Sequence, residues 1–152
     1  MRYVFLSLLF LTACQFHPLY RDQTYTSVCV QSIPEASGYL LYQTLTKRFP
    51  EKESCMYRLV VSTPEFTISD QSISNKDFIT MQKVRANTSF KLLDKDNKQV
   101  LSNSVMAEGS SAVVDNPYST VVSIEKTQKN LVPILAEQIS LHVGAYLDRN
   151  QP

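Results

Sequence analysis

The alternation of apolar and polar positions predicts that the chain opens with a strand followed by a helix. Residues 24–32 are rich in β-branched side chains that alternate with period two, which is typical of a strand. An apolar side chain then recurs at every fourth position, at Leu41, Leu45 and Phe49, which predicts an amphipathic helix. Pro34 suits the first turn of this helix, because the N–H that proline lacks has no partner there in any case.

The next segment predicts a second strand and then a loop. Residues 57–61 alternate between apolar and polar side chains, and the pattern continues loosely through Phe66 and Ile68. Residues 69–77 are polar, which predicts a loop before the following strand.

The clearest alternation in the chain predicts a long β-hairpin. Apolar and polar side chains alternate over residues 84–92, so this strand should have one dry face and one wet face. Residues 94–98 supply turn-forming side chains, and residues 99–114 return as a strand in which Gly109 indicates a bulge. The dry face of the first strand should hold Val84, Ala86, Thr88, Phe90 and Leu92.

A long terminal helix is predicted from Asn116 and Pro117, which can cap and begin it, to about Asp148. Pro133 lies inside this helix and removes one backbone hydrogen bond, so we expect a kink or break between Lys126 and Pro133. The apolar face of the helix should hold Leu131, Leu135, Ile139 and Val143, which recur at every fourth position.

Together these elements predict one α+β domain over residues 24–148, followed by a tail over residues 149–152. The order strand, helix, strand, hairpin, helix predicts a two-layer sandwich, in which two helices pack on one face of a mixed four-stranded sheet. The opposite face of the sheet should be wet or covered by a partner.

The first residues have the layout of an export leader. Arg2 precedes the apolar run 3–11, and small residues then lead to Cys14, as in the lipobox of bacterial lipoproteins. The run is about half the ~20 residues that span a bilayer, so residues 1–13 are predicted to be a cleaved signal peptide. Cys14 would then be the lipidated N-terminus, and residues 14–23 a tether. The alternative is an ordinary secretory leader with an incidental Cys14.

Cys29 and Cys55 would lie in an oxidising compartment, where a disulfide between them has to be weighed. Their predicted strand phases argue against it. Val28 and Val30 share the apolar face of the first strand, so Cys29 points to the opposite side. Cys55 is in phase with the core-facing side chains of the second strand, starting at Tyr57. Opposite faces of one sheet cannot bring two β-carbons within the ~4 Å that a bridge requires, so no disulfide is predicted.

Composition and candidate chemistry argue against several functions. The chain has 15 Lys and Arg against 14 Asp and Glu, which disfavours a nucleic-acid partner, because phosphate binding needs a basic excess. His17 and His142 lie far apart, so no metal site is predicted. The sequence contains no nucleophile–base constellation and no glycine-rich phosphate loop, so we expect neither a cofactor nor an enzymatic activity.

Residues 14–20, Cys-Gln-Phe-His-Pro-Leu-Tyr, resemble the start of the mature chain in the LPS-assembly lipoprotein family, LptE. The predicted order of elements over residues 24–148 and the helical stretch over residues 116–139 are similar to the same family. Gln15 and Pro133 depart from its pattern. The resemblance implies a lipid-anchored outer-membrane lipoprotein on the periplasmic side. Such a protein plugs and helps assemble an LptD-like β-barrel translocon, assists insertion of lipopolysaccharide, and performs no covalent chemistry.

The resemblance also implies a lipopolysaccharide contact through basic residues at one end of the fold. Lys95 and Lys98 occupy the predicted hairpin tip, and Lys129 falls at a matching basic position in the terminal helix. Their ammonium groups would pair with lipid A phosphates, provided that the helix begins beside the hairpin tip. For each lysine the alternative is a solvated surface charge. For the whole protein the alternative is a structural accessory or pilot lipoprotein of another outer-membrane complex, without a lipid ligand.

Overall fold

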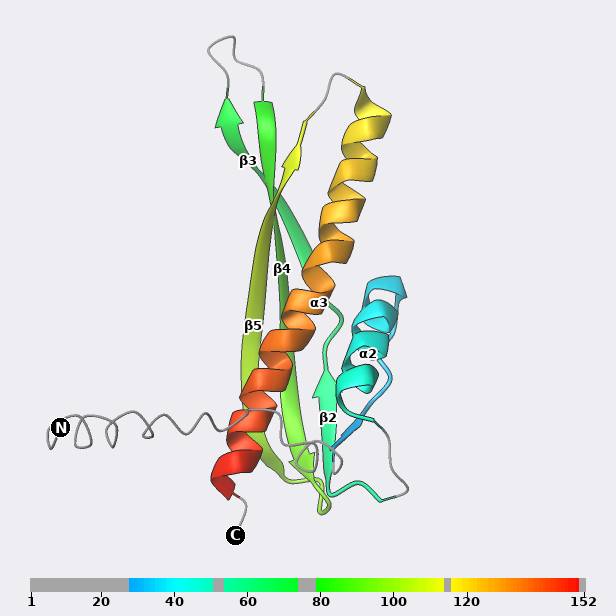
Figure 1. Ribbon diagram of the computed structural model, residues 1–152, viewed down its shortest axis with the longest axis vertical. Helices are drawn as coiled ribbons and strands as arrows, with labels where there is room; N and C mark the ends of the chain where they lie inside the picture. The colour runs from blue at the N-terminus through cyan, green and yellow to red at the C-terminus, as the bar shows by residue number, and fades with distance from the viewer. Residues whose placement is uncertain (1–27, 51–53, 74–78, 114–115, 151–152) are drawn as a thin grey trace, which may run out of the picture.

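The computed structural model describes residues 28–50, 54–73, 79–113 and 116–150 (Figure 1). The predicted class is confirmed, because the described residues form an α+β fold in which two helices lie on one face of a mixed sheet. The elements in chain order are β1 (Val28–Val30), α2 (Ala36–Arg48), β2 (Tyr57–Val61), β3 (Glu65–Ile73), β4 (Ile79–Asp94), β5 (Gln99–Ala112) and α3 (Pro117–Asn150).

The long strand β4 organises the sheet. Its antiparallel neighbour β5 accompanies it along nearly all of its length on one side. The other side is shared, because β2 pairs with residues 90–94 of β4 and β3 pairs with residues 79–87. The short strand β1 pairs in parallel with the outer edge of β2.

The described sheet has five strands rather than the predicted four, because the second predicted strand is divided into β2 and β3. Residues 69–73 belong to β3 rather than to a loop. The polar sequence of this segment gives no sign of a buried face, and Ser69, Asp70 and Gln71 are all exposed. Backbone pairing with β4 holds the segment in the sheet, and two register shifts interrupt that pairing between Asp70 and Ile73.

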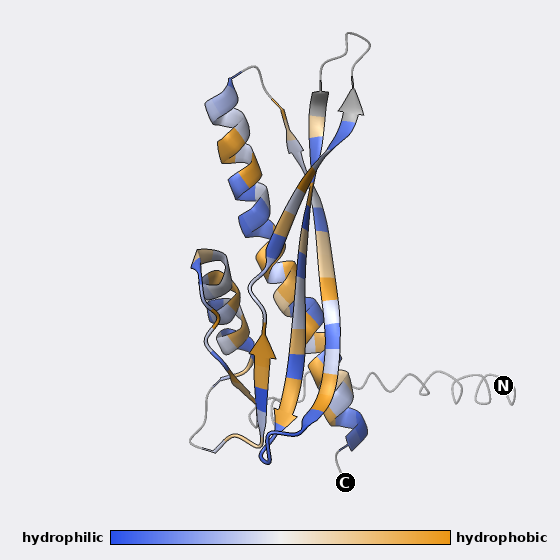
Figure 2. Ribbon diagram, turned by 180° about the vertical axis from the view of Figure 1, so that it is seen from behind, coloured by the Kyte–Doolittle hydropathy of each residue, from blue (hydrophilic) through white to orange (hydrophobic). Residues whose placement is uncertain are grey.

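The hydrophobic core lies between the sheet and the helices, as the alternation of β4 predicts. Phe90 and Leu92 are fully buried, and so are the apolar side chains of α3 that recur at every fourth position. The face of the sheet away from the helices carries the polar residues of β4, so each strand presents one dry face and one wet face. Figure 2 shows this alternation along the strands seen from behind.

The terminal helix α3 runs from Pro117 to Asn150 without the break expected at Pro133. Pro133 and Lys129 are exposed, so water can satisfy the Lys129 carbonyl that loses its helical partner at the proline. This placement keeps the cost of the interior proline away from the core.

Gly109 does not mark a bulge, because the register shift in the β4–β5 ladder lies between Leu92 and Leu93. Its role is close packing. A β-carbon at Gly109 would lie 3.1 Å from Cγ2 of Thr127 and 3.3 Å from Cδ2 of Leu131. The glycine thus lets α3 approach the backbone of β5.

Cys29 and Cys55 are joined by a disulfide, which corrects the prediction that they are unpaired; their Cα atoms are 5.7 Å apart. Cys29 lies between the buried Val28 and Val30, so it faces away from the core as expected. Cys55 precedes β2 instead of belonging to it, so the strand phase does not fix its direction. Because Val28 pairs with Tyr57, the two cysteines meet at one end of the sheet.

Candidate functional site

Cys14, the predicted signal peptide and the tether lie outside the described residues. The first described strand nevertheless shows where the N-terminal segment enters the fold. Val28 at the start of β1 pairs with Tyr57, which pairs in turn with Asp94 at the end of β4. The N-terminal segment therefore joins the sheet at the same end as the β4–β5 hairpin tip.

The hairpin tip holds Lys95 and Lys98 in a tight, exposed turn. The carboxylate of Asp94 accepts hydrogen bonds from the backbone N–H groups of Asp96 and Lys98, both at 2.9 Å. Asn97 adopts a left-handed conformation with φ of 60°, which asparagine tolerates better than most residues. The turn is therefore ordered by its own hydrogen bonds, and both lysine side chains remain exposed.

Arg58 is a third cation at this tip, and it was not among the residues predicted for the site. It lies on β2 at the position that pairs with Leu93, and its Nη1 donates to Oδ1 of Asn97 at 3.2 Å. The only signal in the sequence was its wet-face position in the second strand. We call Arg58, Lys95 and Lys98 the tip cations.

Lys129 does not join the tip cations. It lies between Thr127 and Leu131, the residues that α3 packs against Gly109. Gly109 is ten residues along β5 from Gln99, which at about 3.3 Å per residue puts Lys129 about 33 Å from the tip. The reason is topological: β5 runs away from the tip, so α3 begins at the opposite end of the sheet (Figure 1).

Lys129 instead borders a cleft of about 280 Å³ between α2, α3 and β3. Its apolar lining comes from Ala36 and Leu40 on α2, Phe66 on β3 and Val132 on α3. Glu125, one helical turn before Lys129, lies at the same cleft. This cleft combines a small apolar surface with one cation and one carboxylate at its border.

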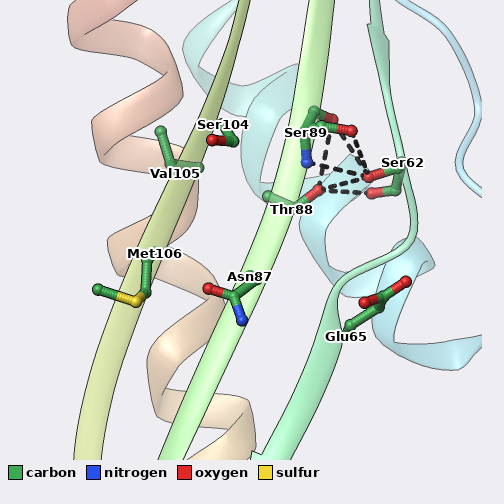
Figure 3. Close-up of a pocket in the computed structure, with 8 residues that line it drawn as sticks. All are labelled: Ser62, Glu65, Asn87, Thr88, Ser89, Ser104, Val105 and Met106. Carbon is green, nitrogen blue, oxygen red and sulfur yellow. Dashed lines mark hydrogen bonds between the residues drawn. The ribbon is translucent and has the colours of Figure 1, made fainter.

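A more polar cleft of about 430 Å³ lies where β2 gives way to β3 along β4 (Figure 3). Thr88 Oγ1 donates to the carbonyl of Ser62 at 2.7 Å, and the Ser89 N–H donates to Ser62 Oγ at 3.0 Å. These bonds hold the chain to β4 at the crossing from β2 to β3. The lining contains hydroxyl groups and one carboxylate, without a histidine beside any serine. The lining residues are Ser62, Glu65, Asn87, Thr88, Ser89, Ser104, Val105 and Met106.

An ion-pair cluster crosses from β4 to β5 on the wet face. Glu108 accepts from Lys83 Nζ at 2.9 Å and from Arg85 Nη2 at 2.6 Å. The hydrogen bond from Lys83, and then that from Arg85, hold the pKa of the Glu108 carboxyl below its usual value. The group is exposed, so the cluster contributes to the register of the hairpin more than to stability.

The described residues contain neither a membrane-spanning helix nor a cluster of metal ligands. No helix among them is both long and apolar enough to cross a bilayer. No three or more histidine, cysteine, aspartate or glutamate side chains among them gather into a group that could hold a metal ion.

The fold is similar to that of several solved structures of bacterial lipoproteins, although no family model and no curated protein matches the sequence. Rare lipoprotein B from Shewanella oneidensis matches with a TM-score of 0.63 and 12% identity, over 82% of this chain and 96% of that one. A minor lipoprotein from Acinetobacter baumannii matches with a TM-score of 0.59 and 20% identity, over 83% and 97%. Lipoprotein B from Nitrosomonas europaea gives 0.59 and 16%, over 87% and 96%. At these identities the likeness shows the fold.

Proposed function

We propose that this chain is an outer-membrane lipoprotein, anchored through Cys14 and facing the periplasm, which plugs and helps assemble an LptD-like β-barrel and assists insertion of lipopolysaccharide. One observation carries the proposal. A lipobox that ends at Cys14, followed by a segment over residues 14–20 that resembles the LptE family, precedes a fold shared over nearly the full length of three bacterial lipoproteins. The stable anchor would come from several acyl chains on one cysteine, since a single chain binds a bilayer only marginally.

The place where the N-terminal segment enters the fold supports a role for the tip cations. The residues that follow Cys14 in the sequence lead into β1, whose first residue, Val28, lies at the end of the sheet that carries the hairpin tip. Arginine and lysine pair well with phosphate, and the anionic groups of lipid A are phosphates. We therefore assign the phosphate contact to Lys95 and Lys98, with Arg58 beside them, and treat Lys129 at its apolar cleft as a separate contact.

The anchor is tested by metabolic labelling with a fatty-acid analogue. The wild-type chain should incorporate the label, and Cys14→Ser should lose it and leave the membrane fraction. Equal labelling of both proteins would remove the lipoprotein assignment. A pull-down from detergent-solubilised outer membrane then tests the partner, which should be a large β-barrel.

The ligand is tested by binding of purified lipopolysaccharide to the full-length protein. Lys95→Glu with Lys98→Glu should weaken binding at least about tenfold, because each change replaces an attraction with a repulsion, and added salt should weaken the wild type in the same direction. Lys126→Glu is the matched control, since Lys126 is exposed on α3 and does not line the cleft at Lys129. Absence of binding by the wild type would favour the accessory-lipoprotein alternative.

A further inference from the structure

The described strands leave three edges of the sheet unpaired, at β1, β3 and β5. An unpaired edge invites another strand, and proteins normally protect such edges with short length, charges, proline or bulges. β1 has three residues, and Cys29 ties it to the segment before β2. β3 carries two register shifts and the acidic residues Glu65 and Asp70. These two edges are protected.

The edge of β5 has little of this protection. The strand is 14 residues long, contains no lysine, arginine or proline, and has Glu108 as its one charged side chain. Its pairing with β4 stays in register from Met81 and Ala112 to Leu92 and Leu101. Serine, alanine and glycine make up seven of its 14 residues, so few bulky side chains flank the edge.

The hydrogen bonds of β4 show which groups of β5 point outward. The Ser89 carbonyl accepts from the Ser62 N–H at 2.9 Å, and the Ser89 N–H donates to Ser62 Oγ at 3.0 Å, so both groups face β2. Ser104 pairs with Ser89, and directly opposed residues of an antiparallel pair point their backbone groups both inward or both outward. Ser104 therefore points away from β4, and its N–H is held by Oδ1 of Asn103 at 2.8 Å. By alternation the outward-pointing residues are Ser102, Ser104, Met106, Glu108, Ser110 and Ala112.

α3 forms an apolar roof beside this edge. Thr127 and Leu131 face Gly109 of β5, and His142 approaches Asn103. With 3.6 residues per turn, Ile134 and Leu141 continue the stripe that begins at Thr127 and Leu131. The side chains of Ile134 and Leu141 are each 43% exposed, so nothing among the described residues covers this part of the stripe beside β5. In Figure 1 the helix crosses the sheet diagonally, and its last turns lie beyond the β5 edge.

We propose that β5 receives one extended segment of another protein as an added strand, with apolar side chains of that segment against Ile134 and Leu141. The outward N–H and C=O groups would bind the backbone of the segment, and the roof would select its side chains. A second copy fits less well: paired strands lie about 4.8 Å apart, whereas packed helices need about 8–10 Å, so two α3 helices would compete for the same space. The proposal goes beyond the proposed function, because it needs neither Cys14 lipidation nor lipopolysaccharide.

The test is amide hydrogen exchange of the full-length protein, in membranes of the cells that make it and after purification in detergent. The outward amides of Met106, Glu108 and Ser110 should exchange at least about tenfold more slowly in the membranes. Met106→Pro removes one outward N–H without removing a bond to β4, so it should abolish this protection, whereas Met106→Ala should keep it. Equal exchange in both settings, or equal behaviour of the two variants, would overturn the proposal.

Variants of α3 and a folding control test whether the protection comes from an added strand. Ile134→Glu with Leu141→Glu should reduce the protection of β5 in membranes, whereas Val121→Glu with Val122→Glu should not, because the latter pair is exposed elsewhere on α3. Circular dichroism checks that every variant folds. Protection that appears in the purified protein and rises with its concentration would assign a second copy to the edge and overturn the proposed occupant. Protection without a co-purified barrel would refute the proposed function alone.

Discussion

The disulfide between Cys29 and Cys55 should be a main support of the N-terminal part of the fold. The two cysteines have a sequence separation of 26, and the loop that their disulfide closes contains all of α2. In the chain-entropy model, a closed loop of this length stabilises the folded state by about 3.5 kcal/mol at 25 °C. β1 has three residues, so it has few backbone hydrogen bonds that could hold it to β2 once the disulfide is lost. Replacing both cysteines by serine should therefore lower the free energy of unfolding by about 3.5 kcal/mol.

The assay is urea unfolding followed by far-ultraviolet circular dichroism, since the chain contains no tryptophan. With a slope of about 2 kcal/mol per molar urea, the midpoint should fall by about 2 M in the double variant. A reductant should produce a similar fall in the wild type and no change in the double variant. Each single variant should resemble the double, because either change removes the same bond. If the reductant leaves the urea midpoint of the wild type unchanged, this reasoning is refuted.

Three further perturbations test the core, the packing of α3 and the charge cluster. Phe90→Ala should cost about 3–5 kcal/mol of unfolding free energy, because the ring is fully buried; unfolding at the wild-type denaturant midpoint would mean that the strand phase is wrong. Gly109→Val should cost about 1–3 kcal/mol, since its side chain would press on α3, whereas Ser110→Val on the exposed face should change the melting temperature little. Glu108→Gln should be slightly less stable than the wild type at neutral pH. Folding lowers the pKa of Glu108, so the charged carboxylate stabilises the folded state above the unfolded-state pKa, and this stabilisation is lost as the pH falls through the folded-state pKa. The stability difference between Glu108→Gln and the wild type should therefore disappear at low pH, and a difference that persists there would contradict the assignment.

Periodicity predicted the elements that bury one face. The dry face of β4 and the apolar side of α3 are both buried as expected. Burial of one face requires apolar residues at a period of two in a strand and 3.6 in a helix, and this period is visible in the sequence. The second half of β3, residues 69–73, could not be predicted in this way. Its residues at 69–71 are polar and exposed, and what holds them is backbone pairing with β4, which leaves no pattern in side-chain hydropathy.

The disulfide was missed because of an element boundary. The phase argument holds only for residues inside a strand, and Cys55 lies two residues before β2 begins at Tyr57. Outside the ladder a side chain is not bound to alternate faces, so Cys55 can reach Cys29. An uncertainty of two residues at a strand end is therefore enough to reverse a disulfide prediction.

The candidate site shows a different limit, which is topological. Lys95 and Lys98 were predicted at the hairpin tip and are found there. Lys129 was grouped with them on the condition that α3 begins beside the tip, but β5 ends at the far side of the sheet. Arg58 was missed because it reaches the tip from a neighbouring strand, a relation that only the pairing of β2 with β4 reveals.

The separation of the tip from Lys129 leads to a last prediction about lipopolysaccharide binding. Groups more than about 10 Å apart with no shared partner usually contribute additively, within about 0.5 kcal/mol. The tip and the cleft are about 33 Å apart along β5. A double-mutant cycle between Lys95→Glu with Lys98→Glu at the tip and Lys129→Glu at the cleft should therefore show additive losses of binding free energy. Lys126→Glu in place of Lys129→Glu provides the control cycle. A coupling above about 1 kcal/mol would mean that one bound molecule, or a change of fold, links the two places, and the two-contact assignment would then be wrong.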